Sequence, residues 1–499
     1  MQAEAIAIVN AIEEACDTGA LRYRGARSWP LARLRLMAAV TQRIASGRNT
    51  AGAAPVTNTG PSFTAAPDAQ AELVGPTDLG LLRAAGRGAV PPARAEILFF
   101  ARPEEHSDRT ATGMFAKTLD SVLERVSGPA LKLELADQRT LGFPRAHPSL
   151  FIDLARAGAG VAFDPPGTLS GLAAVNAAAE RIAGVTLDQA QLLADMGKIF
   201  YFARIFEKLL RALGPKAFIL SVYYHPVGMA WMLACHWAGV TSVDLQHGRL
   251  GPHHGFYTDL IAAPAEGYEL MPDRVWCWGQ RTVEDIARAL NPACMRHRGF
   301  VGGNAWLHKW RYGDVSAFAP PALDAFTERL KGLRVILVSL QPLDTPVPPA
   351  LLEAMGKAPA DWFWLLRLHP LRRHTAPEIA ALLARAGVTR FEMEAATAFP
   401  LFTLLRHADH HVTAFSSVTV EAAAFDLRTS LTSPDGEAIF APEIARGICR
   451  YTPTADALLN HIGGVLSQAR GPLDSDFIDM SPGAVDRALA TITQPKAAA

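Results

Sequence analysis

The sequence has no apolar run long enough to cross a membrane. Its longest apolar runs, such as residues 227–235, fall short of the roughly 20 residues that a membrane-spanning helix requires. The first residues, MQAEAIAIVNAIEEAC, form an amphipathic helical pattern with acidic residues, and they lack the basic segment and apolar core of a signal peptide. We therefore expect a cytoplasmic protein, and any association with the inner membrane would be peripheral.

An excess of charge of either sign is also missing. Lys and Arg number 48, as do Asp and Glu, so the chain lacks the basic excess of a protein that binds the nucleic acid backbone. The five cysteines show no CxxC spacing, and free thiols commonly pack as small apolar groups. These absences predict a reduced cytoplasmic protein with no nucleic acid partner.

The 499 residues, 49% of them hydrophobic, suffice for two or three domains with buried cores. Short apolar runs typical of strands alternate with helical patterns in two series. The first series comprises residues 95–100, 131–135, 217–222, 241–245 and 275–278, and the second comprises residues 334–339, 362–367, 410–415, 428–431 and 449–451. This alternation predicts an α/β fold with two Rossmann-like, doubly wound domains, in which helices cover both faces of each parallel sheet.

Breaks in the alternation divide the chain. Residues 1–44 are typical of a helical N-terminal segment, and residues 45–94, rich in Gly, Ala, Pro, Ser and Thr, of a linker of low order. We predict a first Rossmann-like domain over residues 95–302 and a second over residues 322–470. Gly-Gly-Asn and Pro-Pro interrupt the pattern between them, which predicts a linker over residues 303–321, and residues 471–499 form a C-terminal helix and tail.

The densest group of candidate functional residues follows the strand at 241–245. Ligands of doubly wound sheets bind beyond the carboxyl ends of the strands, and Gln246, His247, Gly248 and Arg249 stand at such an end. Because the pKa of histidine is near neutral, His247 is the preferred general base, with Asp259 as a weaker alternative. The three histidines of this stretch match no tight metal-ligand spacing, so we expect no metal. A histidine that only bonds the loop backbone is the alternative.

A second group ends the strand at 362–367. Arg367 and His369 alternate to the same side of the chain, and Pro370 stops the strand. A guanidinium and an imidazole offer directional donors to phosphate or sugar oxygens.

A third group lies where the strand at 410–415 passes through Ser416 and Ser417 into a helix. The start of a helix offers free N–H groups to an anion, and Glu421, one turn inside, can accept hydrogen bonds from hydroxyl groups. An ordinary serine N-cap is the alternative.

Taken together, these three turns resemble the GT-B glycosyltransferase superfamily over residues 95–461. The likeness is to bacterial surface-polysaccharide enzymes, namely capsule-synthesis transferases that use CMP-activated Kdo or sialic acid, and CDP-glycerol glycerophosphotransferases. In those groups an HP motif and a Ser-Ser or Ser-Thr motif bind the cytidine nucleotide, and His369-Pro370 and Ser416-Ser417 match these motifs. One departure is that Gln246-His247-Gly248 stands where the sialyltransferase-like groups place an acidic motif.

The resemblance implies an enzyme that transfers a sugar from a nucleotide donor, CMP-linked Kdo or sialic acid above others, to a glycan or lipid-linked glycan acceptor of a capsule or lipopolysaccharide. It further implies that the first domain lies on the acceptor side and that the second binds the nucleotide. Inversion at the anomeric carbon, with no metal and no cofactor besides the donor, also follows from it. Two alternatives are open. Glu421 is similar to a carboxylate of UDP-N-acetylglucosamine 2-epimerases, and a non-catalytic polysaccharide-assembly protein would keep the fold without the activity.

Overall fold

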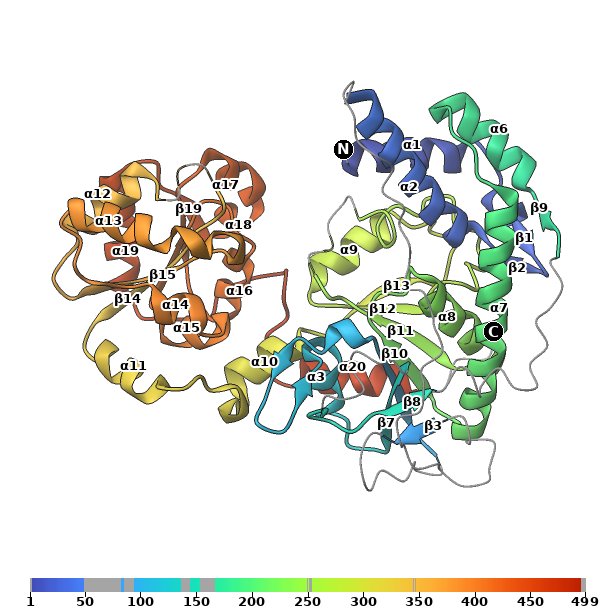
Figure 1. The fold of residues 1–499 in the computed structure, drawn as a ribbon, viewed down its shortest axis with the longest axis horizontal. Helices are drawn as coiled ribbons and strands as arrows, with labels where there is room; N and C mark the ends of the chain where they lie inside the picture. The colour runs from blue at the N-terminus through green and yellow to red at the C-terminus, as the bar shows by residue number, and fades with distance from the viewer. Residues whose placement is uncertain are drawn as a thin grey trace. The chain divides into compact units, whose positions relative to one another are not determined.

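The computed structural model describes residues 2–48, 82–84, 94–135, 144–152, 167–248, 250, 254–343, 345 and 347–494. The chain divides into two compact units, of which the first comprises Met1–Gly303 with Ser481–Ala499 and the second comprises Asn304–Met480. Each unit contains its own sheet, parallel throughout in the second unit and parallel except for one strand in the first (Figure 1). The C-terminal helix α20 (Ala484–Thr493) therefore belongs to the first unit, although the chain reaches it only after the second.

The first unit is built on an eight-stranded sheet with the order β13-β12-β11-β10-β4-β7-β8-β3. Its strands are β3 (Leu82–Ala84), β4 (Ile97–Ala101), β7 (Ala130–Leu135), β8 (Leu150–Ile152), β10 (Ala217–Leu220), β11 (Thr241–Leu245), β12 (Arg274–Cys277) and β13 (Arg298–Val301). All neighbours pair in parallel except β3, which runs antiparallel to β8. The strand order reverses between β4 and β10, because the chain adds β7 and β8 on one side and then β10 to β13 on the other. Such a reversal opens a crevice for a ligand beyond the carboxyl ends of these two strands.

Among the described helices of the first unit, α8 (Pro226–Ala238) packs on this sheet through an aromatic side chain. The described helices are α1 (Gln2–Glu14), α2 (Trp29–Arg48), α3 (Lys117–Leu123), α6 (Leu172–Ala183), α7 (Gln189–Leu213), α8, α9 (Gln280–Arg288) and α20. Trp231 of α8 stacks on Phe206 of α7 and on Phe218 of β10, with ring centroids 3.9 and 4.5 Å apart. These contacts fix α8, the helix that follows β10, against the sheet. The described residues of the unit also form a small sheet of β1 (Arg22–Tyr23), β2 (Ala26–Arg27) and β9 (Leu169–Ser170), and the pair β5 (Asp108–Arg109) and β6 (Met114–Phe115).

The predicted helical N-terminal extension is confirmed, and it packs on the body of the first unit. Trp29 and Arg33 of α2 are buried, and Arg33 forms a buried ion pair with Glu13 of α1. The Arg33 Nε also donates a hydrogen bond to the Gly255 carbonyl over 2.7 Å. Helices α1 and α2 are therefore tied to the segment that follows the His247 turn.

The second unit contains a six-stranded parallel sheet with the order β16-β15-β14-β17-β18-β19. Its strands are β14 (Arg334–Ser339), β15 (Trp362–Arg367), β16 (Phe391–Glu392), β17 (His410–Thr413), β18 (Thr429–Leu431) and β19 (Cys449–Tyr451). Its helices are α10 (Ala305–Tyr312), α11 (Leu323–Leu330), α12 (Pro349–Lys357), α13 (Ala376–Arg385), α14 (Glu394–Ala398), α15 (Leu401–His407), α16 (Val418–Ala424), α17 (Pro434–Ile439), α18 (Ala441–Ala445) and α19 (Ala455–Leu466). Here the strand order reverses between β14 and β17, which is where doubly wound sheets bind ligands.

The predicted α/β fold with two Rossmann-like sheets is confirmed, and each of the ten predicted strands coincides with a strand of the structure to within about two residues, the usual uncertainty at element ends. We predicted a linker over residues 303–321, and the structure has a helix there, α10. Trp306 and Trp310 of α10 are buried, and Arg311 pairs with Asp426 of the second unit. Most of residues 45–94 lies outside the described residues; residues 45–48 end α2, and Leu82–Ala84 form β3.

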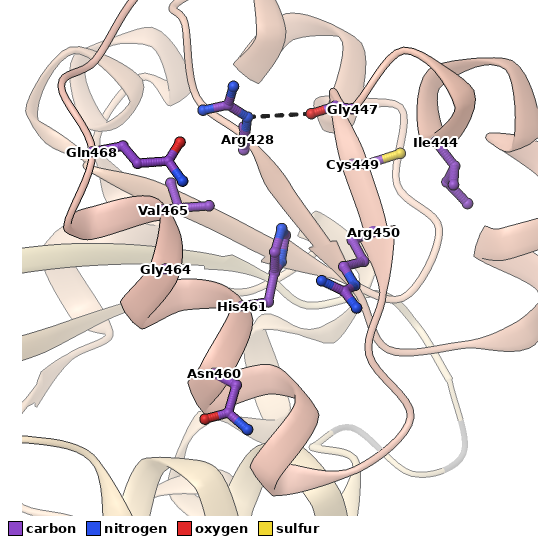
Figure 2. Close-up of a pocket in the computed structure, with 10 residues that line it drawn as sticks. All are labelled: Arg428, Ile444, Gly447, Cys449, Arg450, Asn460, His461, Gly464, Val465 and Gln468. Carbon is purple, nitrogen blue, oxygen red and sulfur yellow. Dashed lines mark hydrogen bonds between the residues drawn. The ribbon is translucent and has the colours of Figure 1, made fainter.

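The second unit contains a cavity of about 500 Å³ at the amino ends of β18 and β19 (Figure 2). Arg428 immediately precedes β18, Arg450 lies on β19, and His461 lies on α19. This opening is at the opposite edge of the sheet from the carboxyl ends of the strands. Over the part of the chain that the structure describes, no helix combines the length and the apolar character needed to span a membrane.

Candidate functional site

The loops after β4 and β10 lie at the reversal of strand order, where doubly wound sheets have their ligand crevice, and a buried carboxylate joins them. The first loop follows β4 and contains Arg102 and the short turn η2 (Pro103–Glu105). The Glu105 carboxylate accepts hydrogen bonds from the Ser221 hydroxyl, just after β10, and from the Arg102 backbone N–H, each over 2.6 Å. Burial raises the pKa of Glu105, against the opposing effect of the Arg102 charge. The Glu105 carboxylate therefore links the loop after β4 to the end of β10.

Arg102 provides the positive charge of this crevice. Its Nη1 lies 3.1 Å from the exposed Glu104 carboxylate, its Nη2 lies 3.8 Å from Glu105, and 24% of its side chain is exposed. After burial, the charge of Arg102 is a further cause that lowers the pKa of both His225 and His247. The charge of Arg102 therefore disfavours protonation of both imidazoles.

Asp244, at the carboxyl end of β11, holds the turn that follows β10. Its two oxygens accept hydrogen bonds from the backbone N–H groups of Val222 and Tyr223, both over 2.9 Å, and from the Tyr257 hydroxyl over 2.7 Å. Val222 is in the left-handed region, with φ 65°, which is unfavourable for a β-branched residue. Burial raises the pKa of Asp244 to about 7, although the three hydrogen bonds favour the carboxylate. Asp244 thus stabilises a turn that Val222 alone would not adopt.

That turn positions His225 at the start of α8. His225 is the N-cap residue, and its Nδ1 accepts a hydrogen bond from the Gly228 N–H over 3.2 Å. Burial lowers the pKa of His225 to about 3, so the ring is neutral at neutral pH. Its buried Nε2 has no hydrogen-bond partner among the described residues. A Cβ atom at Gly228 would overlap the Tyr223 carbonyl, so only glycine allows α8 to start this close to the turn.

An aromatic wall borders His247. The Tyr224 ring stacks on Phe256, with centroids 4.5 Å apart and planes at 9°, and its hydroxyl lies 3.5 Å from His247 Nε2. His254 contacts Tyr257, with ring centroids 4.8 Å apart. Burial lowers the pKa of His247 to about 4, so that at neutral pH the imidazole can accept a proton.

The other residues of the predicted first group have different surroundings. Gln246 is buried, and its side chain donates to the Gly248 carbonyl over 2.9 Å and accepts from the Trp278 N–H over 2.7 Å. Gln246 therefore shapes the loop. Asp259 lies close enough to Glu13 to raise the pKa of that carboxyl, on the side covered by α1 and α2. Arg249 lies outside the described residues.

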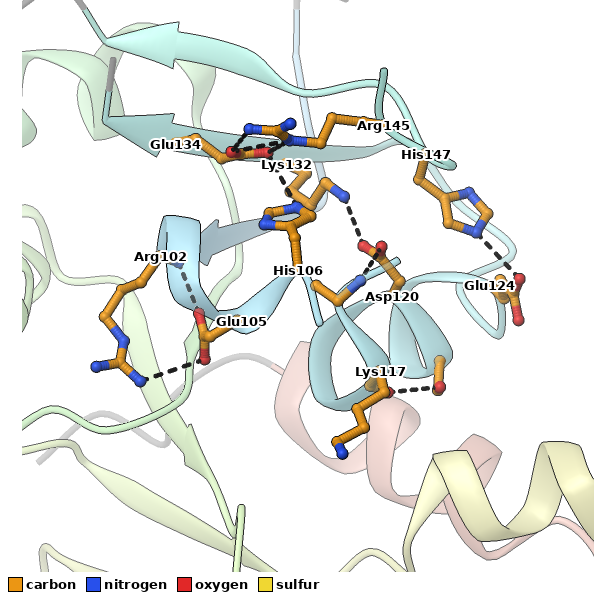
Figure 3. Close-up of polar contacts among 12 residues, drawn as sticks. Arg102, Glu105, His106, Lys117, Asp120, Glu124, Lys132, Glu134, Arg145 and His147 are labelled. Atoms are coloured by element: carbon orange, nitrogen blue, oxygen red, sulfur yellow. Dashed lines mark hydrogen bonds and ion pairs between the residues drawn. The ribbon is translucent and has the colours of Figure 1, made fainter. Parts of the chain in front are cut away.

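A buried network of charged residues anchors the loop that contains Arg102 at its His106 end (Figure 3). His106 Nε2 lies 3.2 Å from the Glu134 carboxylate of β7, which also pairs with Arg145 over 2.9 Å. Lys132, on the same strand, pairs with Asp120 over 2.6 Å. Burial opposes ionisation of Glu134, but hydrogen bonds from His106 and Arg145 outweigh it and lower its pKa to about 2. The Arg102 loop is thus anchored on both sides, by Glu105 to the β10 loop and by His106 to β7.

In the second unit, Arg367 and His369 follow β15. Arg367 Nη1 donates to the carbonyls of Ala396 and Phe399 over 2.9 and 2.6 Å, so its guanidinium holds the segment between β16 and α15. His369 is the N-cap of the turn η4 (Pro370–Thr375), where its Nδ1 accepts from a backbone N–H over 3.3 Å. Its side chain is half-buried, and Pro370 is exposed.

The serines of the third group follow β17. Ser416 Oγ accepts from the Val418 N–H over 3.3 Å, and Ser417 is exposed at the start of α16. Glu421 lies close enough to Arg367 to oppose the fall in its pKa that burial causes. Because β15 and β17 flank β14, the structure brings the second and third groups to one carboxyl edge of the sheet.

Sequence reasoning missed the residues that border the β4–β10 crevice, namely Arg102, Glu105, Ser221, Tyr224 and His225. Polar and aromatic residues directly after two strands were the available signal, but only the strand order shows that the two loops are neighbours. Among the described residues, no three His, Cys, Asp or Glu side chains are grouped as a metal site requires.

Comparison by sequence with protein-family models and with curated proteins gives no match. Among solved structures, UDP-GlcNAc 2-epimerase from Neisseria meningitidis bound to UDP-GlcNAc is similar over 79% of this chain and 98% of that chain, with 10% identity and a TM-score of 0.50. The chain has the GT-B fold. A putative UDP-N-acetylglucosamine 2-epimerase from Listeria monocytogenes (14% identity, 80% of this chain, 96% of that chain, TM-score 0.47) and the glycosyltransferase of kitacinnamycin (16%, 81%, 94%, 0.38) are further matches. At these identities the similarity shows the GT-B fold and no activity.

Proposed function

We propose that this GT-B chain is a glycosyltransferase that uses a nucleotide sugar and transfers the sugar to a glycan or lipid-linked glycan acceptor. The observation that carries the proposal is the pair of loops after β4 and β10, which bring the Arg102 guanidinium and the Tyr224–His247 contact to the carboxyl ends of strands of one sheet. A cation and a base that is neutral at neutral pH suit a reaction in which a hydroxyl loses a proton and a phosphate leaves.

The proposed reaction is a single displacement. The acceptor hydroxyl loses its proton to His247, its oxygen forms a bond to the anomeric carbon, and the bond from that carbon to the nucleotide phosphate oxygen breaks with inversion. Arg102 provides positive charge in the first unit. In the second unit, His369, Ser416 and Ser417 bind the nucleotide, and Glu421 accepts from its hydroxyl groups. With these donors the mechanism includes no metal ion.

The role that we propose for Arg367 follows from its hydrogen bonds. Its Nη1 already donates to two backbone carbonyls, so its free donors are fewer than those of an unpaired guanidinium. We assign it the positioning of the loops after β15 and β16, with Glu421 beside it. His369 and the serines are then the direct contacts of the nucleotide.

A UDP-N-acetylhexosamine 2-epimerase is the second candidate. It is favoured by the similarity in fold to the Neisseria meningitidis epimerase, whose structure contains UDP-GlcNAc. An epimerase would turn over the UDP-sugar alone, whereas a transferase requires an acceptor. The resemblance of His369-Pro370 and Ser416-Ser417 to cytidine-nucleotide motifs favours a CMP-linked donor of the Kdo or sialic acid type.

Thermal unfolding with CMP, CDP, UDP and GDP distinguishes these candidates, because a ligand that binds the folded state raises its apparent stability. We expect CMP to raise the Tm, and His369→Ala to abolish the rise. His374→Ala is the matched control, since His374 is exposed in the same turn η4. A response to UDP alone would favour a hexosyltransferase or the epimerase, which turnover of the UDP-sugar without an acceptor then separates, and no response to any nucleotide would refute both enzymes.

Turnover then tests the proposed base. We expect His247→Ala to reduce sugar transfer by at least about a hundredfold, the usual contribution of general base catalysis, while the response to CMP persists. Transfer at the wild-type rate in His247→Ala would refute the role of His247. Retention of the anomeric configuration in the product, measured by NMR, would refute the single displacement.

A further inference from the structure

The cavity at the amino ends of β18 and β19 gathers positive charge (Figure 2). Arg428, Arg450 and His461 line it together with the side-chain amides of Asn460 and Gln468. Among the described residues that line the cavity, none has a carboxylate. The lining therefore offers hydrogen-bond donors and cationic groups without an internal counter-charge.

Neither arginine of the cavity has a carboxylate partner among the residues that the structure describes. Arg428 Nε donates to the Gly447 carbonyl over 3.2 Å, and Arg450 is exposed on β19. The nearby Arg446, in contrast, pairs with Asp476 over 2.6 Å. Burial lowers the pKa of His461 to about 4, and the charges of Arg450 and Arg428 contribute in the same direction. Both guanidinium groups therefore act on one imidazole.

A buried hydrogen-bonded chain fixes the orientation of His461. His461 Nδ1 lies 2.8 Å from the Ser430 hydroxyl, which in turn lies 2.9 Å from His410 Nε2. Because a hydroxyl has one proton, Ser430 donates to one ring and accepts from the other. Nδ1 of His461 is thus occupied, and Nε2 is the ring atom available to a ligand. The imidazole is held in place before any ligand binds.

We propose that this cavity binds the phosphate group of a small organic molecule. Guanidinium groups match the oxygens of a phosphate with paired N–H donors, and an unbalanced cluster of cations attracts an anion. The volume of about 500 Å³ exceeds that of a phosphate and lies in the range of small-molecule sites. The amides of Asn460 and Gln468 suit the hydroxyl groups of such a molecule.

This phosphate site is separate from the proposed nucleotide site. The cavity opens at the amino ends of β18 and β19, whereas Ser416, Ser417 and His369 follow the carboxyl ends of β17 and β15. Parallel strands point one way, so these are opposite edges of one sheet. Binding at the cavity and binding of CMP therefore respond to different substitutions.

Calorimetric titration with inorganic phosphate and with glucose 1-phosphate tests the proposal. We expect both to bind, and Arg450→Gln to weaken each at least tenfold, since a charge-assisted hydrogen bond contributes about 1.5–3 kcal/mol. Arg385→Gln, at an exposed position of α13 in the same unit, is the matched control and should change affinity less than twofold. Arg428→Gln is the second variant. It ranks after Arg450→Gln because it also removes the hydrogen bond from Arg428 to the Gly447 carbonyl.

Three results would overturn the proposal. The first is that the full chain does not bind inorganic phosphate. The second is that neither Arg450→Gln nor Arg428→Gln changes the affinity for phosphate, and the third is that glucose 1-phosphate does not bind. Histidine NMR gives an independent measurement, in which phosphate should raise the pKa of His461 because an anion favours the imidazolium. Arg450→Gln should still respond to CMP in the thermal assay, so failure of the phosphate site and failure of the proposed function are distinguishable.

Discussion

Replacing Asp244 with Asn tests whether one buried carboxylate sets the geometry of the crevice. An amide has one acceptor oxygen and one NH₂ donor. Whichever way it is turned, a backbone N–H of Val222 or Tyr223 then faces another donor. An unpaired buried donor costs about 1–3 kcal/mol, and the remaining bonds lose the charge that strengthens them. We expect the free energy of unfolding of the first unit to fall by about 2–5 kcal/mol at pH 8, where the wild-type carboxyl is largely ionised.

Hydrogen exchange of the turn measures this effect directly. The amides of Val222 and Tyr223 should exchange at least about 30-fold faster in Asp244→Asn, the factor that corresponds to 2 kcal/mol. Sugar transfer should fall by about a hundredfold, because His225 and Tyr224 lose their positions.

Asp273→Asn is the matched control for Asp244→Asn. Asp273 accepts from the backbone N–H and the hydroxyl of Ser242, over 3.0 and 3.1 Å, at the amino end of the same strand β11. It should lower stability and leave turnover unchanged. Wild-type exchange at Val222 in Asp244→Asn, or an equal loss of turnover in both variants, would refute the reasoning.

Three further predictions concern charge and packing. His411 is buried, and its pKa is about 3. Its neutral form therefore stabilises the second unit above the unfolded pKa of about 6.5. Below that pH the free energy of unfolding falls, by about 2 kcal/mol per such histidine between pH 7 and pH 5. In urea unfolding, the fall in stability between pH 7 and pH 5 should be smaller in His411→Gln than in the wild type, by the contribution of this one histidine. The same fall in both proteins would contradict the prediction. Arg102→Gln should raise the pKa of His247 and move the acidic limb of the kcat/KM profile to higher pH; an unmoved limb would show that the two charges do not interact. Gly228→Ala should destabilise the first unit by about 1–3 kcal/mol, because the added methyl group overpacks the turn. Gly463→Ala, at an open position in helix α19, should instead stabilise the second unit by about 0.5–1 kcal/mol. The midpoints of urea unfolding measure both effects.

The alternation of strands and helices was readable from the sequence because it is local. Runs such as Ile97–Ala101 are apolar on both faces, as buried parallel strands require, and each is followed by a helical pattern. The short strands Phe391–Glu392 and Leu150–Ile152 were missed, whereas the similarly short Thr429–Leu431 and Cys449–Tyr451 were predicted. The helix Ala305–Tyr312 was hidden because glycine and proline on either side indicate a break.

The candidate site was readable only where one segment contains its residues. The turn at His247 directly follows its strand, so its position was predictable, and Ser416 was predictable for the same reason. Arg102 and His225 are separated by more than 100 residues, and they become neighbours only because β4 pairs with β10. In the sequence, Asp244 is one acidic residue of an otherwise uncharged strand. Its role is visible only in the structure, where its carboxylate accepts a hydrogen bond from the N–H group of a turn residue 21 positions earlier. Pairing between distant strands is the information that the local pattern lacks.

The hydrogen bond from Arg33, the partner of Glu13, to Gly255 affects when α1 and α2 can finish folding during synthesis. Arg33 Nε donates to the carbonyl of Gly255, a residue that is synthesised 222 positions later. At about 5–20 residues per second this interval lasts roughly 10–40 s. During that time α1 and α2 exist without the segment against which they are buried, and their apolar faces are open to chaperones. The earliest helices to be made thus reach their final environment only after the middle of the chain has been synthesised, and the segment bearing His254 is secured at the same moment.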